Sequence, residues 1–401
     1  MTRDMLIFDA IRTPRGAARP DGALAGVRPV ELVAGLMREL VNRNDLDTKL
    51  VDDTVLGCNT QFGDQGANIA KISALLAGWD PKSGGSTVNR FCASGLDAVA
   101  TAAAKVGAGF AELIVAGGVE SMSRVPMFAD AGAWFADPEI AARTKFLHMG
   151  IAADVLASRH GITRDDTEAY ANRSQSRAAA GWAAGIHDGA VIPVCDDAGG
   201  VLLASDACMR ATRLEKLARF DPAFAAFMTP ETQALIDNAY PTLGAIDHVH
   251  TVGSSPAMCD AASLVLIGSA RAGITAGLTP RARVVASCEI GSDPIEMLGG
   301  VVPALKRAAK QAGLGLGDLD VIECNESFAA TPIHLQRSLE LDPERVNPNG
   351  GAIALGHPLG ATGGILLATA LLELERSGGR YGAVTIPAGA GIASAMVIER
   401  M

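Results

Sequence analysis

Aromatic side chains are scarce in this sequence of 401 residues, where Phe, Trp and Tyr together make up 4%. So few rings argue against the stacking surface with which proteins hold single-stranded nucleic acid. Positive charge is short as well, because 44 acidic residues outnumber 34 basic ones and the net charge is −10. Since a phosphate backbone is bound by an excess of basic residues, we expect no nucleic-acid partner.

Long apolar runs are also missing. No uninterrupted run reaches the roughly 20 residues that a membrane-spanning helix needs. Residues 1–9 hold an acidic residue within their apolar run and no small-residue cleavage site, which predicts a first strand rather than a signal peptide. The seven cysteines form no C-x-x-C pair, which favours reduced thiols over a disulfide framework or a zinc site. We therefore expect a cytoplasmic protein with no metal ion and no membrane contact.

Apolar residues and glycine are abundant, at 49% hydrophobic residues and 45 glycines. The length allows two or three domains with large cores. Short apolar strands, such as 53–57 and 112–118, alternate with amphipathic helices, such as 29–41 and 301–312. This alternation predicts a layered α/β fold with a mostly parallel sheet. We interpret the Gly117-Gly118 pair, which ends one of these strands, as a tight turn.

A nucleophile is predicted within residues 86–97, with the sequence Ser-Thr-Val-Asn-Arg-Phe-Cys-Ala-Ser-Gly-Leu-Asp. A β-branched run stops at Cys92, and from Leu96 the apolar positions repeat with the period of a buried helix. Free backbone N–H groups and the helix dipole favour an anion at such a helix start. That setting lowers the pKa of a thiol and makes it a nucleophile. A small buried hydrophobe is the alternative interpretation of Cys92.

Two later segments carry polar groups in unusual surroundings. Residues 347–364 are too rich in glycine for regular structure and too apolar for a linker, and they do not match a phosphate-binding loop. Within them, Gly356 and Pro358 fix the backbone around the titratable ring of His357. Asn325 directly follows a strand predicted over 319–323, which is where α/β sheets place their ligand sites, although a helix cap is the alternative.

These segments together resemble the thiolase family of CoA-dependent carbon–carbon bond enzymes. The resemblance runs from Arg12-Thr13-Pro14 to the last residues, and its four specific blocks are 89–95, 117–123, 325–329 and 347–363. It implies two similar α/β halves in a five-layered α-β-α-β-α core, with residues 1–120 and 250–272 in the first half and 273–401 in the second. It also implies a CoA-binding loop domain over 121–249, and a homodimer or homotetramer.

The resemblance implies a catalytic role for four residues. Cys92 would attack the carbonyl of an acyl-CoA to form an acyl-enzyme, and His357 would take the thiol proton. His357 and a water held by Asn325 would stabilise one oxyanion. The backbone N–H groups of Cys92 and Gly389 would stabilise a second oxyanion. CoA is then a co-substrate, with acyl-CoA as the other partner, and no permanently bound cofactor is expected.

The same resemblance implies residues that hold the CoA arm. His148, Met149 and Phe328 match positions that line the pantetheine tunnel. The family's CoA-contacting Ser falls at Pro256, so Ser254 or Ser255 is expected to substitute for it.

A second departure from the family lies in the last loop, where Pro387 occupies the position of the second catalytic cysteine. That cysteine moves the α-proton in the Claisen step, and proline has no ionisable group. General acid–base catalysis typically contributes about 10²–10⁴-fold to a rate. The sequence therefore predicts either a substitute for this group or a reaction that needs none.

Three functions fit these residues. The first is thiolysis of a 3-oxoacyl-CoA or the reverse condensation, with Cys259, Cys288 or Cys324 replacing the missing cysteine, or His357 acting alone. Cys324 is a poor substitute because its side chain would point to the face opposite Asn325. The second is acyl-CoA hydrolysis or acyl transfer to another nucleophile, which needs no α-proton. A non-catalytic CoA-ester-binding protein is the least favoured, because it has no use for a nucleophile.

Overall fold

One large mixed sheet runs through the protein. The computed structural model describes residues 4–211 and 213–401. Within these residues, ten strands form the sheet in the order β10-β11-β12-β9-β1-β8-β5-β3-β4, with β2 paired to β8. The strands are β1 (Leu6–Arg12), β2 (Gly16–Ala17), β3 (Asp53–Gly57), β4 (Ser86–Val88), β5 (Leu113–Ser121), β8 (Cys259–Gly268), β9 (Ala282–Gly291), β10 (Val321–Cys324), β11 (Tyr381–Pro387) and β12 (Ile392–Arg400).

The sheet repeats one strand order twice. In the first half β1 pairs with β8, β8 with β5 and β5 with β3, and in the second half β9 pairs with β12, β12 with β11 and β11 with β10. The first two pairings of each half are antiparallel and the third is parallel. Leu6–Arg283 and Ile7–Ala282 join the two halves. The chain therefore contains the two similar α/β halves that the family resemblance implies.

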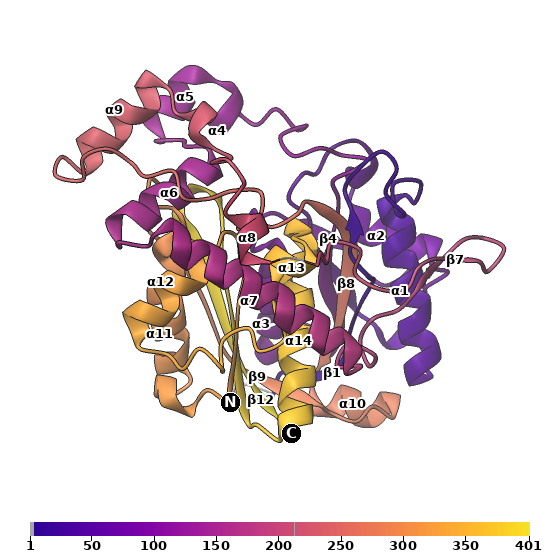
Figure 1. Ribbon diagram of the computed structural model, residues 1–401. Helices are drawn as coiled ribbons and strands as arrows, with labels where there is room; N and C mark the ends of the chain where they lie inside the picture. Colours follow the sequence, from indigo (N-terminus) through magenta and orange to yellow (C-terminus); the bar gives the residue numbers. More distant parts are fainter. Residues whose placement is uncertain (1–3, 212) are drawn as a thin grey trace.

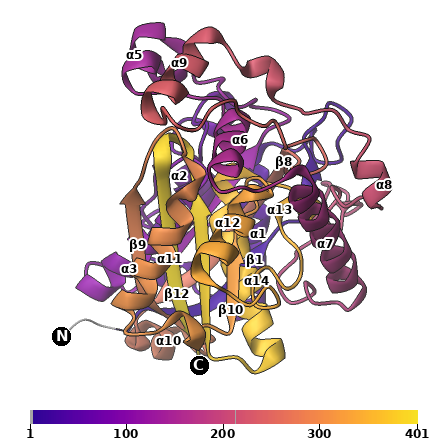
Figure 2. The ribbon, with the colours of Figure 1, turned by 60° about the vertical axis from the view of Figure 1, so that its left-hand side comes forward.

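Helices separate and cover the two half-sheets. Helices α3 (Ser94–Ala108) and α14 (Thr362–Ser377) pack against each other between the half-sheets. Helices α1 (Pro29–Asn44) and α2 (Ile69–Leu76) cover the outer face of the first half, and α11 (Val301–Gln311) and α12 (Ala330–Leu339) cover that of the second. Figure 1 shows α11 and α12 on one flank and α1 and α2 on the other, and Figure 2 views the molecule with α11 and α12 brought forward. The α-β-α-β-α layering is confirmed.

The segment between β5 and β8 lies over one end of the sheet. It holds α4 (Ala133–Ala136), α5 (Pro138–Arg143), α6 (Met149–Arg159), α7 (Arg164–Ala183), α8 (Leu214–Leu217), α9 (Pro230–Ala239) and the hairpin of β6 (Val194–Cys195) and β7 (Val201–Leu203). Figure 1 shows α4, α5, α6 and α9 gathered at its upper left. Ile236 of α9 packs against Ile151 and Val155 of α6, which gives residues 221–250 their path.

The boundaries predicted for the two halves and for the loop domain stay a prediction. None of the helices in the described part of the chain has both the length and the apolar character to cross a bilayer.

The Gly117-Gly118 pair is not a turn, so that interpretation was wrong. Strand β5 continues through both glycines to Ser121. A Cβ atom on Gly118 would lie 1.9 Å from the carbonyl oxygen of Gly360, and one on Gly117 would lie 2.0 Å from the carbonyl oxygen of Ser263. The absence of a side chain at Gly117 lets β8 approach closely, and its absence at Gly118 lets backbone of the second half rest directly on β5.

The expectation that residues 347–364 form no regular structure was also wrong. Residues Ala352–Leu355 form the helical turn α13, and Thr362 already begins α14. The buried Glu326 carboxylate accepts a hydrogen bond of 3.0 Å from the Ile353 N–H, and the Ser174 hydroxyl accepts one of 3.1 Å from the Gly351 N–H. These contacts satisfy N–H groups at the start of a turn that is too short to be stable alone.

The glycine contact between the halves makes a stability prediction. Gly118→Ala should lower the free energy of unfolding by more than about 3 kcal/mol, because a methyl group cannot fit against Gly360 without moving backbone. Gly35→Ala is the matched control, since no atom lies within 4 Å of a Cβ there and the site is inside α1. We expect that control to gain about 0.5–1 kcal/mol. Urea unfolding of both variants measures the difference, and similar small changes in the two would contradict the prediction.

Candidate active site

One cavity of about 330 Å³ is lined by residues from both halves and from the segment between β5 and β8. Cys92 contributes from the first half, His357 and Gly389 from the second, and His148 from the intervening segment. Residues far apart in the sequence thus share one apolar hollow, as the family resemblance implies for the first three.

Cys92 lies just before α3, with Ala93 as the N-cap residue. Its surroundings raise the pKa of the thiol to about 12, first through burial and then through the negative charge of Glu120. A hydrogen bond from the backbone N–H of Cys92 itself lowers the pKa of the thiol, but this effect is smaller than the other two. The expectation that the helix start leaves this thiol with a lowered pKa was therefore wrong. A neutral Cys92 needs a proton acceptor to become a nucleophile.

His357 is held in the tautomer of a base. Its Nδ1 lies 2.8 Å from the Thr362 Oγ1, and its Nε2 lies 3.4 Å from the Asn325 Nδ2. Because an amide nitrogen only donates, Nε2 is an acceptor and the ring proton sits on Nδ1. Burial, followed by the positive charge of Arg15, lowers the pKa of His357 to about 3. The imidazole is therefore neutral at physiological pH, and its proton-accepting atom is Nε2, which the Asn325 amide contacts.

Asn325 is fully buried at the end of β10. Its Nδ2 donates a hydrogen bond of 2.8 Å to the Ser327 Oγ. Its Oδ1 accepts no hydrogen bond from any residue that the structure describes. The amide is thus oriented by Ser327 and His357, and its oxygen is available to a small polar group such as water.

Glu120 joins the two halves near Cys92, a role that the sequence did not reveal. Its carboxylate accepts hydrogen bonds from the N–H groups of Asn59 at 2.9 Å, Thr60 at 3.1 Å and Gly360 at 2.9 Å. Gln65 Nε2 donates a further bond of 2.8 Å. Burial raises the pKa of Glu120, and these bonds oppose that rise. In the sequence, the one indication of this role was an acidic residue that follows the apolar, glycine-containing strand end Gly117-Gly118-Val119.

Most of the residues predicted to hold CoA line the cavity. His148, Met149, Phe328 and Ser255 are among the lining residues. His148 caps α6 and stacks on Phe227, with ring centroids 4.0 Å apart. The structure places Ser254 elsewhere: its buried hydroxyl accepts a hydrogen bond of 3.0 Å from the Thr251 N–H.

Pro387 ends β11 and lines the cavity together with Cys92. The three cysteines considered as substitutes, Cys259, Cys288 and Cys324, are buried and lie outside the set of lining residues. Within the described chain, the titratable side chains that line the cavity are those of Cys92, Asp130, His148 and His357.

Comparisons with known proteins agree with this geometry. Residues 5–230 match the family model described as thiolase, N-terminal domain, and residues 278–400 match the model described as thiolase, C-terminal domain. The chain belongs to the thiolase family. It is therefore an acyl-CoA C-acyltransferase that uses CoA as a substrate, and the resemblance drawn from the four sequence blocks is confirmed.

Individual thiolases match along their whole length. A β-ketoadipyl-CoA thiolase of Escherichia coli is 39% identical over 422 residues, and the match covers 100% of both proteins. A steroid 3-ketoacyl-CoA thiolase of Mycobacterium tuberculosis is 36% identical over 98% of this chain and 94% of that protein. The crystal structure of the Bacillus anthracis acetyl-CoA acetyltransferase has a TM-score of 0.87 at 31% identity, and it covers 100% of this chain.

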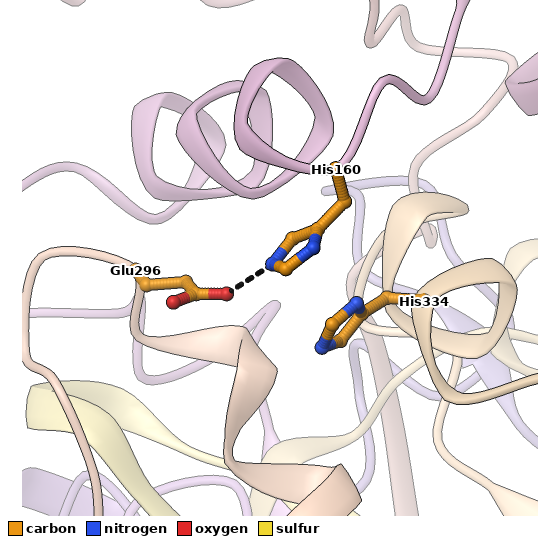
Figure 3. Close-up of side chains that lie close together, drawn as sticks. All are labelled: His160, Glu296 and His334. Atoms are coloured by element: carbon orange, nitrogen blue, oxygen red, sulfur yellow. Dashed lines mark hydrogen bonds and ion pairs between the residues drawn. The ribbon is translucent and has the colours of Figure 1, made fainter. Parts of the chain in front are cut away.

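A polar cluster of this thiolase contains metal-ligating side chains. Figure 3 shows His160, Glu296 and His334 turned toward one another, and their ligand atoms lie within 4.8 Å of one another. His160 Nε2 lies 2.8 Å from Glu296 Oε1, and the Arg159 guanidinium also pairs with that carboxylate. Because the Arg159 guanidinium already neutralises the Glu296 carboxylate, we interpret the cluster as a structural contact that links α6, the residues before Met297 and α12. The expectation of no metal ion stays a prediction.

Buried histidines make the stability of this thiolase depend on pH. Burial lowers the pKa of His187 and of His357 to about 3, and that of His334 to about 4. An unfolded histidine has a pKa of about 6.5, so the unfolded chain takes up protons first as the pH falls below that value. The contribution of these histidines to stability is therefore fully present above about pH 6.5 and is lost as the pH falls, toward about pH 4 for His334 and about pH 3 for His187 and His357. At pH 5 the loss is about 2 kcal/mol for each histidine.

Urea unfolding at pH 7 and pH 5 measures this loss. His334→Gln should show a drop that is smaller than that of the wild type by about 2 kcal/mol. Equal drops in the two proteins would show that His334 does not carry the depressed pKa.

Proposed function

We propose that this thiolase cleaves 3-oxoacyl-CoA substrates by thiolysis, and runs the reverse condensation, through an acyl group carried on Cys92. The shared cavity carries the proposal, because it places a nucleophile, a neutral imidazole and the Gly389 loop against one apolar hollow. The first half-reaction begins when Cys92 Sγ attacks the C3 carbonyl carbon and its proton passes to His357 Nε2. The backbone N–H groups of Cys92 and Gly389 are the proposed donors to that oxyanion.

His357 then supplies the proton that the missing cysteine would have given. When the C2–C3 bond breaks, its electron pair stays on C2, and the His357 imidazolium returns the proton there to give acetyl-CoA. In the second half-reaction the thiol of CoA gives its proton to His357 and attacks the acyl-enzyme. Cys92 leaves as a thiolate and recovers that proton. In each half-reaction His357 takes up one proton and returns it. Thiolysis therefore requires no second thiol at position 387.

Asn325 supports the second oxyanion in this scheme. Its unpaired buried Oδ1 and its contact with His357 Nε2 suit a water that donates to the amide and faces the thioester oxygen of acetyl-CoA. His148, Met149, Ser255 and Phe328 are the proposed wall for the CoA arm, and Ser254 supports this wall through its turn. Since His148 and Met149 come from residues 121–249, that segment is the proposed CoA-binding loop domain, inserted between β5 and β8 of the first half.

Hydrolysis of the acyl-enzyme is the second candidate, and Pro387 favours it. Attack by water on the Cys92 thioester needs no proton transfer at the substrate α-carbon. The products separate the two candidates: thiolysis yields a shortened acyl-CoA, whereas hydrolysis yields a free acid.

Assembly as a homodimer or homotetramer in the cytoplasm is also proposed. Ile72, Leu75 and Leu76 of α2 are large apolar side chains with 44–47% exposure, and α2 packs beside the edge strand β4. An exposed apolar helix face next to an unpaired strand edge is typical of an interface between subunits.

Acylation of Cys92 tests the proposed function. After mixing with acetyl-CoA, we expect peptide mass spectra to place the acetyl group on Cys92. Cys92→Ser should abolish labelling, whereas Cys195→Ser, which alters an exposed cysteine outside the cavity, should leave it unchanged.

His357→Asn should slow both acylation of Cys92 and its alkylation by iodoacetamide by about 10²–10⁴-fold, because the thiol loses its base. An acetyl group on another cysteine, or an unchanged alkylation rate in His357→Asn, would overturn these roles.

Restoring the thiol in the last loop tests the meaning of Pro387. Pro387→Cys should raise the exchange of acetyl-CoA α-protons with deuterated solvent by at least about tenfold, since a thiol then faces the α-carbon. Pro387→Ala is the matched control, because it removes the stiff ring without adding an acid or base. Proton NMR of acetyl-CoA follows the exchange. Rapid exchange in the wild type would show that another group already moves the α-proton, so that Pro387 causes no loss of this function.

A further inference from the structure

Aromatic rings gather at this cavity although the chain has few of them. Six of the 11 Phe residues and one of the three Trp residues line it. We define the aromatic wall as four of these side chains, Phe91, Phe128, Trp134 and Phe135. The Phe91 and Trp134 ring centroids are 5.0 Å apart, and those of Phe128 and Phe135 are 4.5 Å apart. Phe146 joins the two pairs, with centroids 4.9 Å from Trp134 and 6.4 Å from Phe135. Such tilted and edge-on packing gives a firm apolar surface.

The aromatic wall adjoins the reacting atoms. Phe91 directly precedes Cys92, and a Cβ atom on Gly389 would lie 2.9 Å from the Trp134 ring and 3.3 Å from the Phe91 ring. The CoA arm is assigned to a separate group of rings, in which His148 stacks on Phe227. An acyl group on Cys92 whose oxygen points at Gly389 is therefore left facing the aromatic wall.

Two residues of the aromatic wall hold strained backbone. Phe91 has a φ of 50° and Phe128 a φ of 71°, values that a bulky residue seldom adopts. Such strain persists where the surrounding fold imposes it, and it concentrates at functional sites. The fold thus keeps both rings at the cavity at some cost in stability, which supports a role in binding.

Cations are missing from the lining. Among the lining residues of the described chain there is no Lys or Arg, and the one acidic residue is Asp130. Met122 and Met127 line the same cavity and are also apolar. A carboxylate withdrawn from water into such surroundings needs a cation or several donors to offset its lost hydration.

We propose, on the basis of the thiolase activity proposed above, that the acyl site takes an uncharged apolar acyl group. Ring-bearing chains are favoured, because flat faces and edges of the aromatic wall match a ring. Chains that end in a carboxylate are rejected. This specificity separates the chain from its β-ketoadipyl-CoA thiolase relatives, since adipyl is the acyl group of a dicarboxylic acid.

Thiolysis kinetics of the full-length protein test this specificity. The decisive pair is 3-oxohexanoyl-CoA and 3-oxoadipyl-CoA, which share a chain length and differ in the terminal methyl or carboxylate. We expect kcat/KM to be at least about 100-fold lower for the carboxylate. With 3-oxo-5-phenylpentanoyl-CoA, we expect kcat/KM at least equal to that of 3-oxohexanoyl-CoA. Equal or faster cleavage of 3-oxoadipyl-CoA would overturn the proposal.

Variants locate the selectivity in the aromatic wall. Met127→Lys should raise kcat/KM for 3-oxoadipyl-CoA by about tenfold or more, and Met401→Lys, the same change at an exposed site, should not. Phe135→Ala should lower kcat/KM for the phenyl substrate by about tenfold more than it lowers kcat/KM for 3-oxobutanoyl-CoA. Phe110→Ala, at a ring that is 85% exposed, is its control. If a variant misfolds, the kcat/KM values of the wild type for 3-oxohexanoyl-CoA and 3-oxoadipyl-CoA still test the proposed specificity.

Failure of the proposed function has a different signature. If no 3-oxoacyl-CoA is cleaved and Cys92 carries no acyl group, thiolysis is overturned whatever the acyl site prefers. Calorimetric titration with hexanoyl-CoA and adipoyl-CoA then judges the acyl site alone. Weaker binding of adipoyl-CoA supports the specificity, and equal or tighter binding overturns it.

Discussion

The contact between the Gly360 loop and strand β5 is the constraint on which the catalytic geometry depends. Cys92 and His357 belong to different halves, so their placement requires the halves to approach backbone against backbone. Gly118 allows that approach, and Glu120, two residues further along the same strand, fixes it through the Gly360 N–H. The Glu120 carboxylate also holds the N–H groups of Asn59 and Thr60, so one buried side chain spans the junction.

Burial keeps the resting site uncharged. Desolvation raises the pKa of Cys92 and lowers that of His357, so each group is held in its neutral form. Charge then arises only when the thiol proton moves and an oxyanion forms. Donors that are already fixed by the fold act most strongly at that moment, because little water competes with them in an apolar cavity. The same dryness that makes the thiol a poor acid on its own makes the aromatic wall a poor place for a carboxylate.

Much of this arrangement could be predicted from the sequence, because apolar periodicity and motif order are local. Strand 53–57 has the expected bounds, and the helix expected over 301–312 ends one residue earlier. Cys92 and His357 line one cavity and Asn325 contacts His357, although the catalytic roles of these residues stay proposals. The thiol pKa was mispredicted because a helix start is visible in sequence, whereas burial and the charge of Glu120 depend on the neighbouring strand.

The remaining differences have the same origin. Helix α13 forms because Glu326, far earlier in the chain, accepts a hydrogen bond from one of its N–H groups. Helix α12 begins with Ala-Thr-Pro-Ile-His, a stretch whose apolar spacing is too irregular to reveal it. The path of residues 221–250 follows from the packing of Ile236 on α6, a contact that no local pattern indicates. Long-range contacts decided α13 and the path of residues 221–250.

Duplication of the half-domain has an electrostatic consequence at the cavity floor. A Cβ atom on Gly363 would lie 2.0 Å from the Leu96 N atom, so the first turns of α3 and α14 touch. These helices occupy the same place in the two halves, and each carries about half a positive elementary charge at its N-terminus. A negative charge formed at Cys92 is therefore attracted by two helix dipoles, one from each copy. Each half thus contributes a positive helix end near the nucleophile, and neither contribution requires a cationic side chain.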